Sequence, residues 1–163
     1  MAESIAFSKG ADRATIYSEI LPQIEALIGP ESDMTANLGN IAAVLKEAFG
    51  FLWIGFYLSD GRELVLNAFQ GPLACTRIAF TSGVCGHSYS TASTVIVADV
   101  EKFPGHIACS SLSKSEIVVP IFDSEKSVCG VMDVDSERLA DFSEIDAEWL
   151  GKIVALIERK MRG

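Results

Sequence analysis

The sequence has no hydrophobic run long enough to cross a bilayer, and it has no basic segment followed by an apolar one near its first residue. We therefore expect neither a membrane segment nor a secretory signal, and we place the protein in the reducing cytoplasm. Basic residues are also scarce, because 13 Lys and Arg stand against 22 Asp and Glu, which gives a net charge of −9. Nucleic acids and anionic membranes would repel such a chain, so neither is expected as a partner.

Proline is scarce as well, and internal repeats, low-complexity tracts and linkers are absent. The 163 residues include 5 Pro and 13 Gly, and 49% of them are apolar, which is typical of a globular protein. A chain of this length can bury a hydrophobic core without help from disulfides or metals. We expect an N-terminal arm over residues 1–11 and a single domain over residues 12–163.

Apolar residues recur at helical spacing in three parts of the chain. The spacing predicts helices over residues 12–28 and 34–49, with Gly50 as the C-terminal signal of the second helix. A third helix is predicted to begin at Ser143, because Asp146 follows three residues later, as in a capping box. The buried stripe of this helix is expected to contain Ile145, Trp149, Ile153 and Leu156.

Two predicted strand hairpins divide the rest of the chain, and they pair 51–58 with 63–69 and 116–122 with 127–136. The segments between them predict a short helix, a strand and a long loop, over 83–93, 94–100 and 101–115 respectively. Loops longer than about 12 residues in compact domains are typically functional or mobile. The element order predicts an α+β fold, in which an antiparallel sheet carries the N- and C-terminal helices on one face and the long loops on the other.

Side chains of the predicted strand 51–58 alternate between two faces of the sheet. The set expected to face the helices is Leu52, Ile54, Phe56 and Leu58. The opposite face is expected to carry Phe51, Trp53, Gly55 and Tyr57. Aromatic side chains on either side of Gly55 leave a hollow suited to a methyl or thioether group. The alternative is that another layer of the fold packs against this face.

Acidic residues gather on the predicted strand 127–136. Its alternation places Cys129, Val131, Asp133 and Asp135 on one face, and Glu116 begins the neighbouring strand. Like charges this close are costly, so at least one carboxyl group should have a raised pKa unless a cation relieves the repulsion. The cluster indicates a pocket for an ammonium group or for a divalent cation. A solvated strand end is the alternative.

Three of the four cysteines, Cys75, Cys85 and Cys109, lie in the irregular middle of the chain. Cys129 lies inside a predicted strand, where an inert packed thiol is expected. The three loop cysteines suit thiol redox chemistry, in which one attacks an oxidised substrate and becomes a sulfenic acid. A second cysteine then closes a disulfide. The alternative is that all three are small buried residues.

A zinc site is the other chemistry that cysteine and histidine allow. Cys85 with His87 and His106 with Cys109 would supply two thiolates and two imidazoles. Neither spacing matches the usual ligand pairs of structural zinc sites, so we expect no such site.

Five segments carry distinctive motifs: WIGFYL (53–58), GVCG (83–86), ADVEKFPGHIAC (98–109), KSEIVVPI (114–121) and GVMDVDS (130–136). PGHIAC followed by SEIVVP, with two further cysteines at matching separations, is not a pattern of GAF domains at large. The sequence closely resembles the free methionine-R-sulfoxide reductase family of GAF domains, over roughly residues 12–160.

The resemblance implies a single GAF domain in which Cys109 attacks the sulfoxide and Cys75 or Cys85 resolves the sulfenic acid. The substrate-binding residues that it implies are Trp53, Tyr57, Glu116, Asp133 and Asp135. Glu116 or one of the aspartates is a candidate for the acid that protonates the sulfoxide oxygen. The resemblance also implies recycling by thioredoxin or a similar dithiol, a homodimer, no metal and no organic cofactor. The first and last strands should lie side by side.

Two rival classes remain at this point. A non-enzymatic GAF sensor would bind a small ligand, but loop cysteines are superfluous for binding alone. A thiol peroxide or redox sensor would use the same cysteines without a pocket for an amino acid, and the aromatic and acidic residues argue against it.

Overall fold

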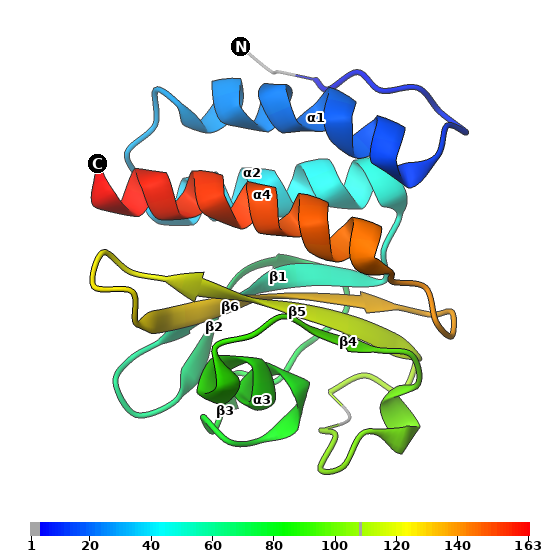
Figure 1. Cartoon of the computed structure of the whole chain (residues 1–163), viewed down its shortest axis with the longest axis vertical. Coiled ribbons are helices and arrows are strands. Elements are labelled where there is room, and N and C mark those ends of the chain that lie inside the picture. The colour runs from blue at the N-terminus through cyan, green and yellow to red at the C-terminus, as the bar shows by residue number, and fades with distance from the viewer. Residues whose placement is uncertain (1–3, 108) are drawn as a thin grey trace.

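Within residues 4–107 and 109–163, which the computed structural model describes, the chain folds into a six-stranded antiparallel sheet with helices on both faces (Figure 1). The helices are α1 (Arg13–Ile28), α2 (Met34–Phe49), α3 (Gly83–Thr91) and α4 (Glu144–Arg162), and a 3-10 turn, η1, spans Val100–Lys102. The strands are β1 (Trp53–Ser59), β2 (Leu64–Gln70), β3 (Arg77–Ile78), β4 (Val95–Val97), β5 (Ser115–Phe122) and β6 (Val128–Ser136).

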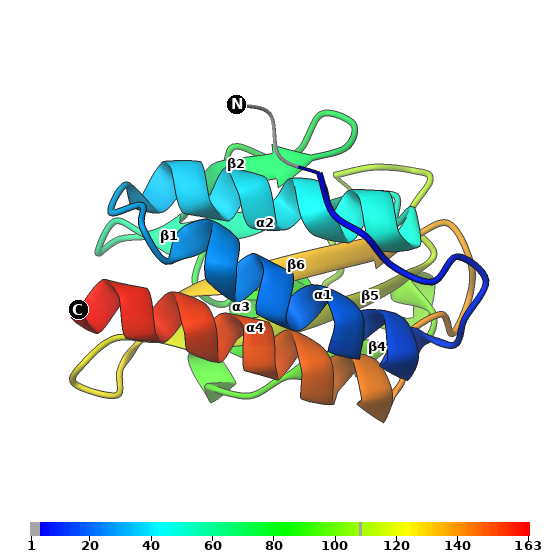
Figure 2. The ribbon, with the colours of Figure 1, turned by 90° about the horizontal axis from the view of Figure 1, so that it is seen from above.

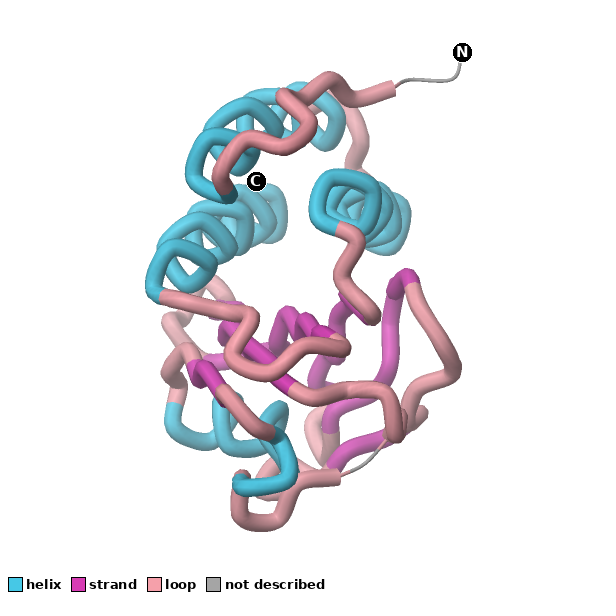
Figure 3. The backbone as a smooth tube through the Cα atoms, turned by 90° about the vertical axis from the view of Figure 1, so that its right-hand side faces the viewer, coloured by secondary structure: helices cyan, strands magenta, loops and turns pink. Residues whose placement is uncertain are grey.

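The strand order is β3-β2-β1-β6-β5-β4, so the first and last strands pair at the centre of the sheet. α2 and α4 cover one face, and α1 lies across them on the side away from the sheet (Figure 1, Figure 3). Figure 2 shows the same three helices from above, side by side over the strands. α3 and the long irregular segments lie on the opposite face. The predicted α+β architecture is confirmed.

The main hydrophobic core lies between the helices and the sheet. Its fully buried members include Ile20, Ile41, Ile54, Ile117 and Leu150. Burying each such side chain contributes roughly 1.5–3 kcal/mol, so this layer supplies most of the apolar stabilisation. A second cluster lies on the opposite face and includes Trp53, Tyr57, Val118 and Val131. The sheet therefore has two apolar faces, and the second one forms the floor of a cavity.

The predicted alternation of the first strand is wrong at its start. Phe51 packs in the helix-side core, whereas Leu52 packs with the cluster on the other face. The reason is that β1 begins only at Trp53, so the two residues before it follow no strand alternation. From Trp53 onward the alternation holds, because Ile54 faces the helices and Tyr57 faces away.

The predicted position of Cys129 beside the aspartates is also wrong. β5 pairs Ile121 with Gly130 but Phe122 with Val128, so Cys129 is an extra residue in a bulge. The bulge turns its side chain toward the helix-side core, where its Sγ lies 3.5 Å from the Ile121 carbonyl oxygen. Cys129 is therefore separated from the acidic residues by the sheet.

Helix α4 begins as predicted, with Ser143 and Asp146 forming a capping box. Ile145 does not belong to the buried stripe, because it is 45% exposed, and Trp149 is partly buried. The buried residues are Asp146, Leu150, Ile153, Val154, Leu156 and Ile157. The capping box turns Asp146 inward, and this rotates Ile145 toward solvent. None of the described helices is long and apolar enough to cross a membrane.

The N-terminal arm is tied to α1 over its described residues. The backbone of Ala6 exchanges hydrogen bonds with the Gln23 side chain, and Ser8 donates two hydrogen bonds to Glu19. Residues 1–3 lie outside the described residues, and the division between residues 11 and 12 stays a prediction. The expected strand 94–100 is shorter, because β4 ends at Val97 and η1 follows.

Asp146 connects α4 to α1 through a buried polar network. Its Oδ1 accepts a hydrogen bond of 2.8 Å from the Tyr17 hydroxyl, and its Oδ2 accepts one of 3.0 Å from Arg13. The backbone N–H of Ser143 also donates to Oδ2 at 2.9 Å. One carboxylate therefore caps α4 and holds α1 in place.

We predict that Asp146→Ala lowers the free energy of unfolding by about 3 kcal/mol, because it removes one half of the α4 capping box, leaves the Tyr17 hydroxyl without its buried partner and deprives Arg13 of one of its two carboxylate partners. Chemical denaturation measures this loss. Glu148→Ala on the same helix is the control, since the Glu148 side chain is 61% exposed and should change stability little. Equal stability of the two variants would show that the network contributes nothing.

Candidate active site

A cavity lies on the sheet face opposite α1, α2 and α4, over the centre of the sheet. Its floor is formed by β1, β5 and β6, and one wall is the beginning of α3, including Cys85. The segments around Ala74 and around Ile107 close it from the solvent side. Leu73, which is 90% exposed, lines the cavity, so the cavity reaches the surface there.

The strand register places three acidic side chains together on the cavity floor. β1 and β6 pair Trp53 with Asp135 and Gly55 with Asp133, and β5 pairs Glu116 with Asp135. Glu116 and Asp133 are buried, with 5% and 6% exposed, and Asp135 is partly buried. The Ser113 hydroxyl donates a hydrogen bond of 2.8 Å to Asp135. The predicted acid cluster therefore forms across two neighbouring strands.

Burial raises the pKa of all three carboxyl groups. For Glu116 and Asp135 the pKa is raised well above its usual value, first by burial and then by the neighbouring Asp133. The pKa of Asp133 is raised by burial, while contacts with Glu116, Cys85 and His106 lower it in part. Among the described residues that line the cavity, none is a lysine or an arginine. A cationic ligand would therefore find carboxyl groups with no competing cation.

Two polar atoms of the cavity are buried without a hydrogen-bond partner among the described residues: Asp133 Oδ1 and Trp53 Nε1. An unpaired buried polar group costs about 1–3 kcal/mol, so such groups are usually paired with a ligand or water when the protein works. One orphan is an acceptor on a carboxyl group and the other is an indole donor. The pair suits a ligand that carries both an ammonium group and a polar oxygen.

The aromatic side of the cavity is formed by a stack of rings. The Trp53 ring lies 5.9 Å from the Tyr57 ring and 5.3 Å from the Phe69 ring, measured between centroids. The expected hollow above Gly55 is filled, because a Cβ there would lie 2.6 Å from Trp53 Cη2 and 2.4 Å from the Phe69 Cβ. Glycine is required so that the indole can fold down onto β1. The wall is aromatic as predicted, but the space for a ligand lies beside the indole.

The four cysteines separate into a bonded pair and two free thiols. Cys75 and Cys109 form a disulfide, with their Cα atoms 5.4 Å apart. Cys109 is exposed at the cavity lining, and Cys75 is partly buried. The Tyr57 hydroxyl donates a hydrogen bond of 2.8 Å to the Cys75 carbonyl, which ties this disulfide to the aromatic wall.

Cys85 is a free thiol on α3, the short helix predicted over residues 83–93, and it is 4% exposed. Burial raises its pKa well above the usual value, and the nearby Asp133 and Glu116 raise it further. The zinc site considered in the sequence analysis, made of Cys85, His87, His106 and Cys109, does not form while the disulfide is present. Its Cys109 is bonded to Cys75, and its His87 ring packs edge-on against Phe103 at 5.7 Å.

Sequence reasoning missed the contact of Ser113 with the acid cluster and misjudged His106. Ser113 lies in the expected loop, and nothing in its neighbourhood in the chain points to its bond with Asp135. His106 was considered only as a zinc ligand, but its Nε2 lies 4.0 Å from Glu116 Oε1. Burial lowers the pKa of His106, and Asp133 opposes this in part. His106 lies within the motif at residues 98–109, which is a signal that could have found it, whereas Ser113 lies outside the motifs.

Comparison with known proteins finds one matching family model and three similar proteins. The GAF domain family model matches residues 31–160. GAF domain-containing protein A of Dictyostelium discoideum is 54% identical, over 97% of this chain and 99% of that protein. The free methionine-R-sulfoxide reductase of Saccharomyces cerevisiae is 37% identical, over 97% of this chain and 92% of that protein. The X-ray structure of free methionine-R-sulfoxide reductase from Neisseria meningitidis, in complex with its substrate, is 55% identical with a TM-score of 0.94, covering 98% of this chain and 95% of that one.

The sheet order, the helix layer and the family match together define a GAF domain. Within that class, the chain belongs to the free methionine-R-sulfoxide reductase family.

The buried acids generate a prediction about stability. Because the folded-state pKa of Glu116 lies above its unfolded value, Glu116 costs the folded state stability as pH rises from about 4.5 toward the raised pKa. We predict that Glu116→Gln raises the free energy of unfolding by roughly 1–2 kcal/mol at pH 8, and that the gain shrinks toward zero near pH 4.5.

Thermal or urea unfolding at several pH values, with both proteins in the disulfide state, measures the difference. Glu137→Gln is the control, since Glu137 is exposed and directly follows β6. A gain that is independent of pH, or a loss at pH 8, would contradict the assignment of a raised pKa.

Proposed function

We propose that this protein reduces free methionine-R-sulfoxide to methionine through a sulfenic acid on Cys109 and a disulfide with Cys75. The observation that carries the proposal is the Cys75–Cys109 disulfide at a cavity lined by buried acids and aromatic rings. That disulfide is the state expected after one turnover. The relatives in yeast and Neisseria meningitidis, which are named for this activity, support the substrate.

The reaction begins when the Cys109 thiolate attacks the sulfoxide sulfur while a carboxylic acid protonates the oxygen. Glu116 is our candidate for that acid, because burial raises its pKa well above the usual value and so favours its protonated form. This attack forms a bond between the Cys109 sulfur and the substrate sulfur. The protonated oxygen then moves with its S–O electron pair to the Cys109 sulfur, which becomes a sulfenic acid, while the S–S bond breaks and methionine leaves with the electron pair of that bond. The Cys75 thiol then attacks the sulfenic sulfur, which releases water and closes the disulfide.

Two parts of the cavity recognise the two ends of the substrate. Asp133 Oδ1 and the neighbouring carboxyl groups accept hydrogen bonds from the ammonium group, which also relieves their mutual repulsion. Trp53 and Tyr57 enclose the S-methyl end, and the unpaired indole N–H of Trp53 is available to a polar oxygen. The cavity thereby favours a free amino acid over a methionine within a peptide, because a peptide lacks the ammonium group.

A dithiol such as thioredoxin then exchanges with the disulfide and restores both thiols. The overall reaction converts one sulfoxide and one dithiol into methionine, water and one disulfide. The exposure of Cys109 supports this step, because a reducing protein must reach a sulfur atom of the pair. A cytoplasmic location would supply that reductant. A homodimer stays a prediction, which light scattering of the purified protein tests.

We predict distinct outcomes for substitutions of the two bonded cysteines. Cys109→Ser should reduce methionine formation to the background rate, because a hydroxyl is a far poorer nucleophile than a thiolate. Cys75→Ser should release about one methionine per protein molecule and then accumulate the sulfenic acid, which dimedone traps. Its rate with thioredoxin should fall at least about tenfold. Rapid-quench measurement of methionine and mass spectrometry of the trapped protein distinguish the two variants.

Cys129→Ser is the matched control, since Cys129 lies on the other side of the sheet and should leave turnover unchanged. Substantial activity of Cys109→Ser would overturn the first step. A dominant bridge from Cys109 to Cys85 in the wild-type protein would overturn Cys75 as the resolving residue.

A further inference from the structure

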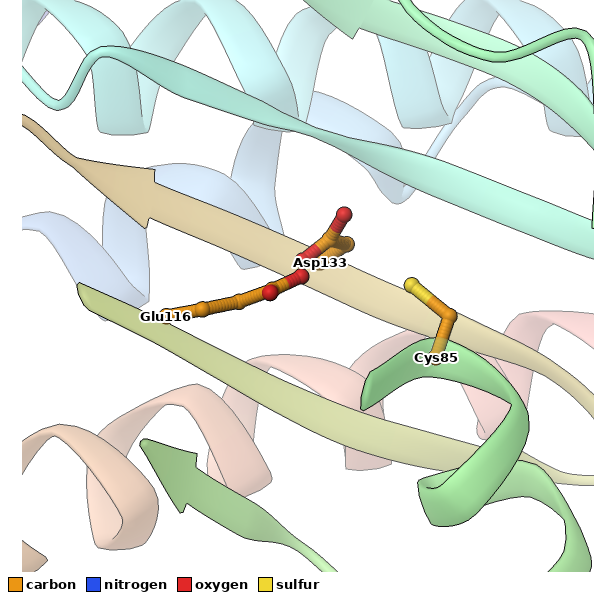
Figure 4. Close-up of side chains that lie close together, drawn as sticks. All are labelled: Cys85, Glu116 and Asp133. Atoms are coloured by element: carbon orange, nitrogen blue, oxygen red, sulfur yellow. The ribbon is translucent and has the colours of Figure 1, made fainter. Parts of the chain in front are cut away.

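Cys85 is a buried free thiol that the proposed reaction does not use, because Cys109 is resolved by Cys75. It lies in the cavity wall, at the beginning of α3. Figure 4 shows that Cys85, Glu116 and Asp133 come from α3, β5 and β6 and point toward one another. The Cys85 sulfur and one carboxylate oxygen from each acid all lie within 4.8 Å of one another.

His106 adds an imidazole to this group. Its Nε2 lies 4.0 Å from Glu116 Oε1, and its side chain is 16% exposed. Thiolate sulfur, imidazole nitrogen and carboxylate oxygen are the ligands that zinc takes in proteins, at about 2.0–2.3 Å. Two ligands of one tetrahedral ion are therefore about 3.3–3.8 Å apart. Shifts of about 1 Å or less bring Cys85, Glu116 and Asp133 to that spacing, and the same holds for His106 relative to Glu116.

The charge balance of the cavity also favours a divalent cation. Three carboxyl groups and a thiol share the cavity, and none of its described lining residues is a lysine or an arginine. Asp133 Oδ1 is buried and has no hydrogen-bond partner among the described residues. An ammonium group satisfies such an oxygen through a hydrogen bond, but it does not displace the proton of the Cys85 thiol. A borderline-soft metal ion satisfies all four groups.

We propose that Cys85, His106, Glu116 and Asp133 form a binding site for a divalent cation of the zinc class. The ion replaces the proton on the Cys85 thiol and the protons held by the carboxyl groups, and these protons pass to the solvent. The ion is an inhibitor of the protein rather than its cofactor. Because it takes the carboxylates that hold the substrate's ammonium group, it and the amino acid exclude each other. This exclusion rests on the proposed function, whereas the metal site itself does not.

The disulfide form of the protein isolates the site for an experiment. With Cys75 and Cys109 bonded, the chain's remaining thiols are Cys85 and Cys129. Co²⁺ is the probe, because a cobalt–thiolate bond produces a charge-transfer absorption that carboxylate ligands do not. We expect one Co²⁺ per chain, displaced by Zn²⁺. Cys85→Ser should abolish the absorption and weaken Zn²⁺ binding at least about tenfold. Asp133→Asn should weaken Zn²⁺ binding as well, and Cys129→Ser should change neither signal.

Two results would overturn the site: no Co²⁺–thiolate absorption in the wild-type protein, or an absorption that survives Cys85→Ser and disappears in Cys129→Ser. Circular dichroism of each variant ensures that a lost signal is not a lost fold. Free methionine should reduce Co²⁺ binding. If free methionine leaves Co²⁺ binding unchanged, while the protein reduces methionine sulfoxide normally, then the metal ion and the amino acid do not exclude each other and this part of the proposal is wrong. If reductase activity is absent while Co²⁺ binding follows Cys85, the proposed function fails and the metal site stands.

Discussion

The antiparallel register of β6 between β1 and β5 is the constraint on which the site depends. It sets Asp135 opposite Trp53 on one side and opposite Glu116 on the other. A slip of one residue in either pairing would turn the acidic side chains toward the helices and bury them in an apolar layer. The hydrophobic faces that α2 and α4 cover therefore hold the register on which the cavity relies. Packing of the helices on one face of the sheet therefore positions the acidic side chains on the other face.

The acids are held in that register at a cost to the folded state. Their pKa values are raised because burial and mutual repulsion disfavour their charged forms, so ionising these carboxyl groups costs the folded state stability. A cationic ligand removes this cost, and the protein thereby gains affinity for an ammonium group. The same tension explains why a divalent metal ion would compete for the cavity. Functional sites commonly contain such unfavourable interactions, which lower the stability of the folded protein but favour ligand binding.

Much of the fold could be predicted from the sequence because it follows from local patterns. The helical spacing in residues 12–49 and the positive φ of Gly50 both depend on neighbours along the chain. The alternation from Trp53 onward correctly separated the two faces of β1. The motif around Cys109 pointed to the family and, with the flanking strands, to the residues that the structure gathers in one cavity.

The parts that could not be predicted depend on partners far away in the sequence. The bulge that moves Cys129 is set by the pairing of β6 with β5, and alternation within one strand cannot reveal it. The choice between Cys75 and Cys85 as partner of Cys109 requires a distance between segments that are separate in the sequence. The same holds for the thiol, imidazole and carboxyl groups of the proposed metal site, which come from four segments and match no ligand spacing. Ile145 turned outward because Asp146 is held by α1.

The central claim, that buried acids select the ammonium group of a free amino acid, is tested most directly by comparing two substrates. The kcat/KM of the wild-type protein with thioredoxin should be measured for free methionine-R-sulfoxide and for its N-acetyl derivative. Loss of the ammonium partner leaves buried carboxyl groups unpaired, which costs about 1–3 kcal/mol. The account predicts a preference for the free substrate of roughly tenfold to a hundredfold. Equal values for the two substrates would contradict it.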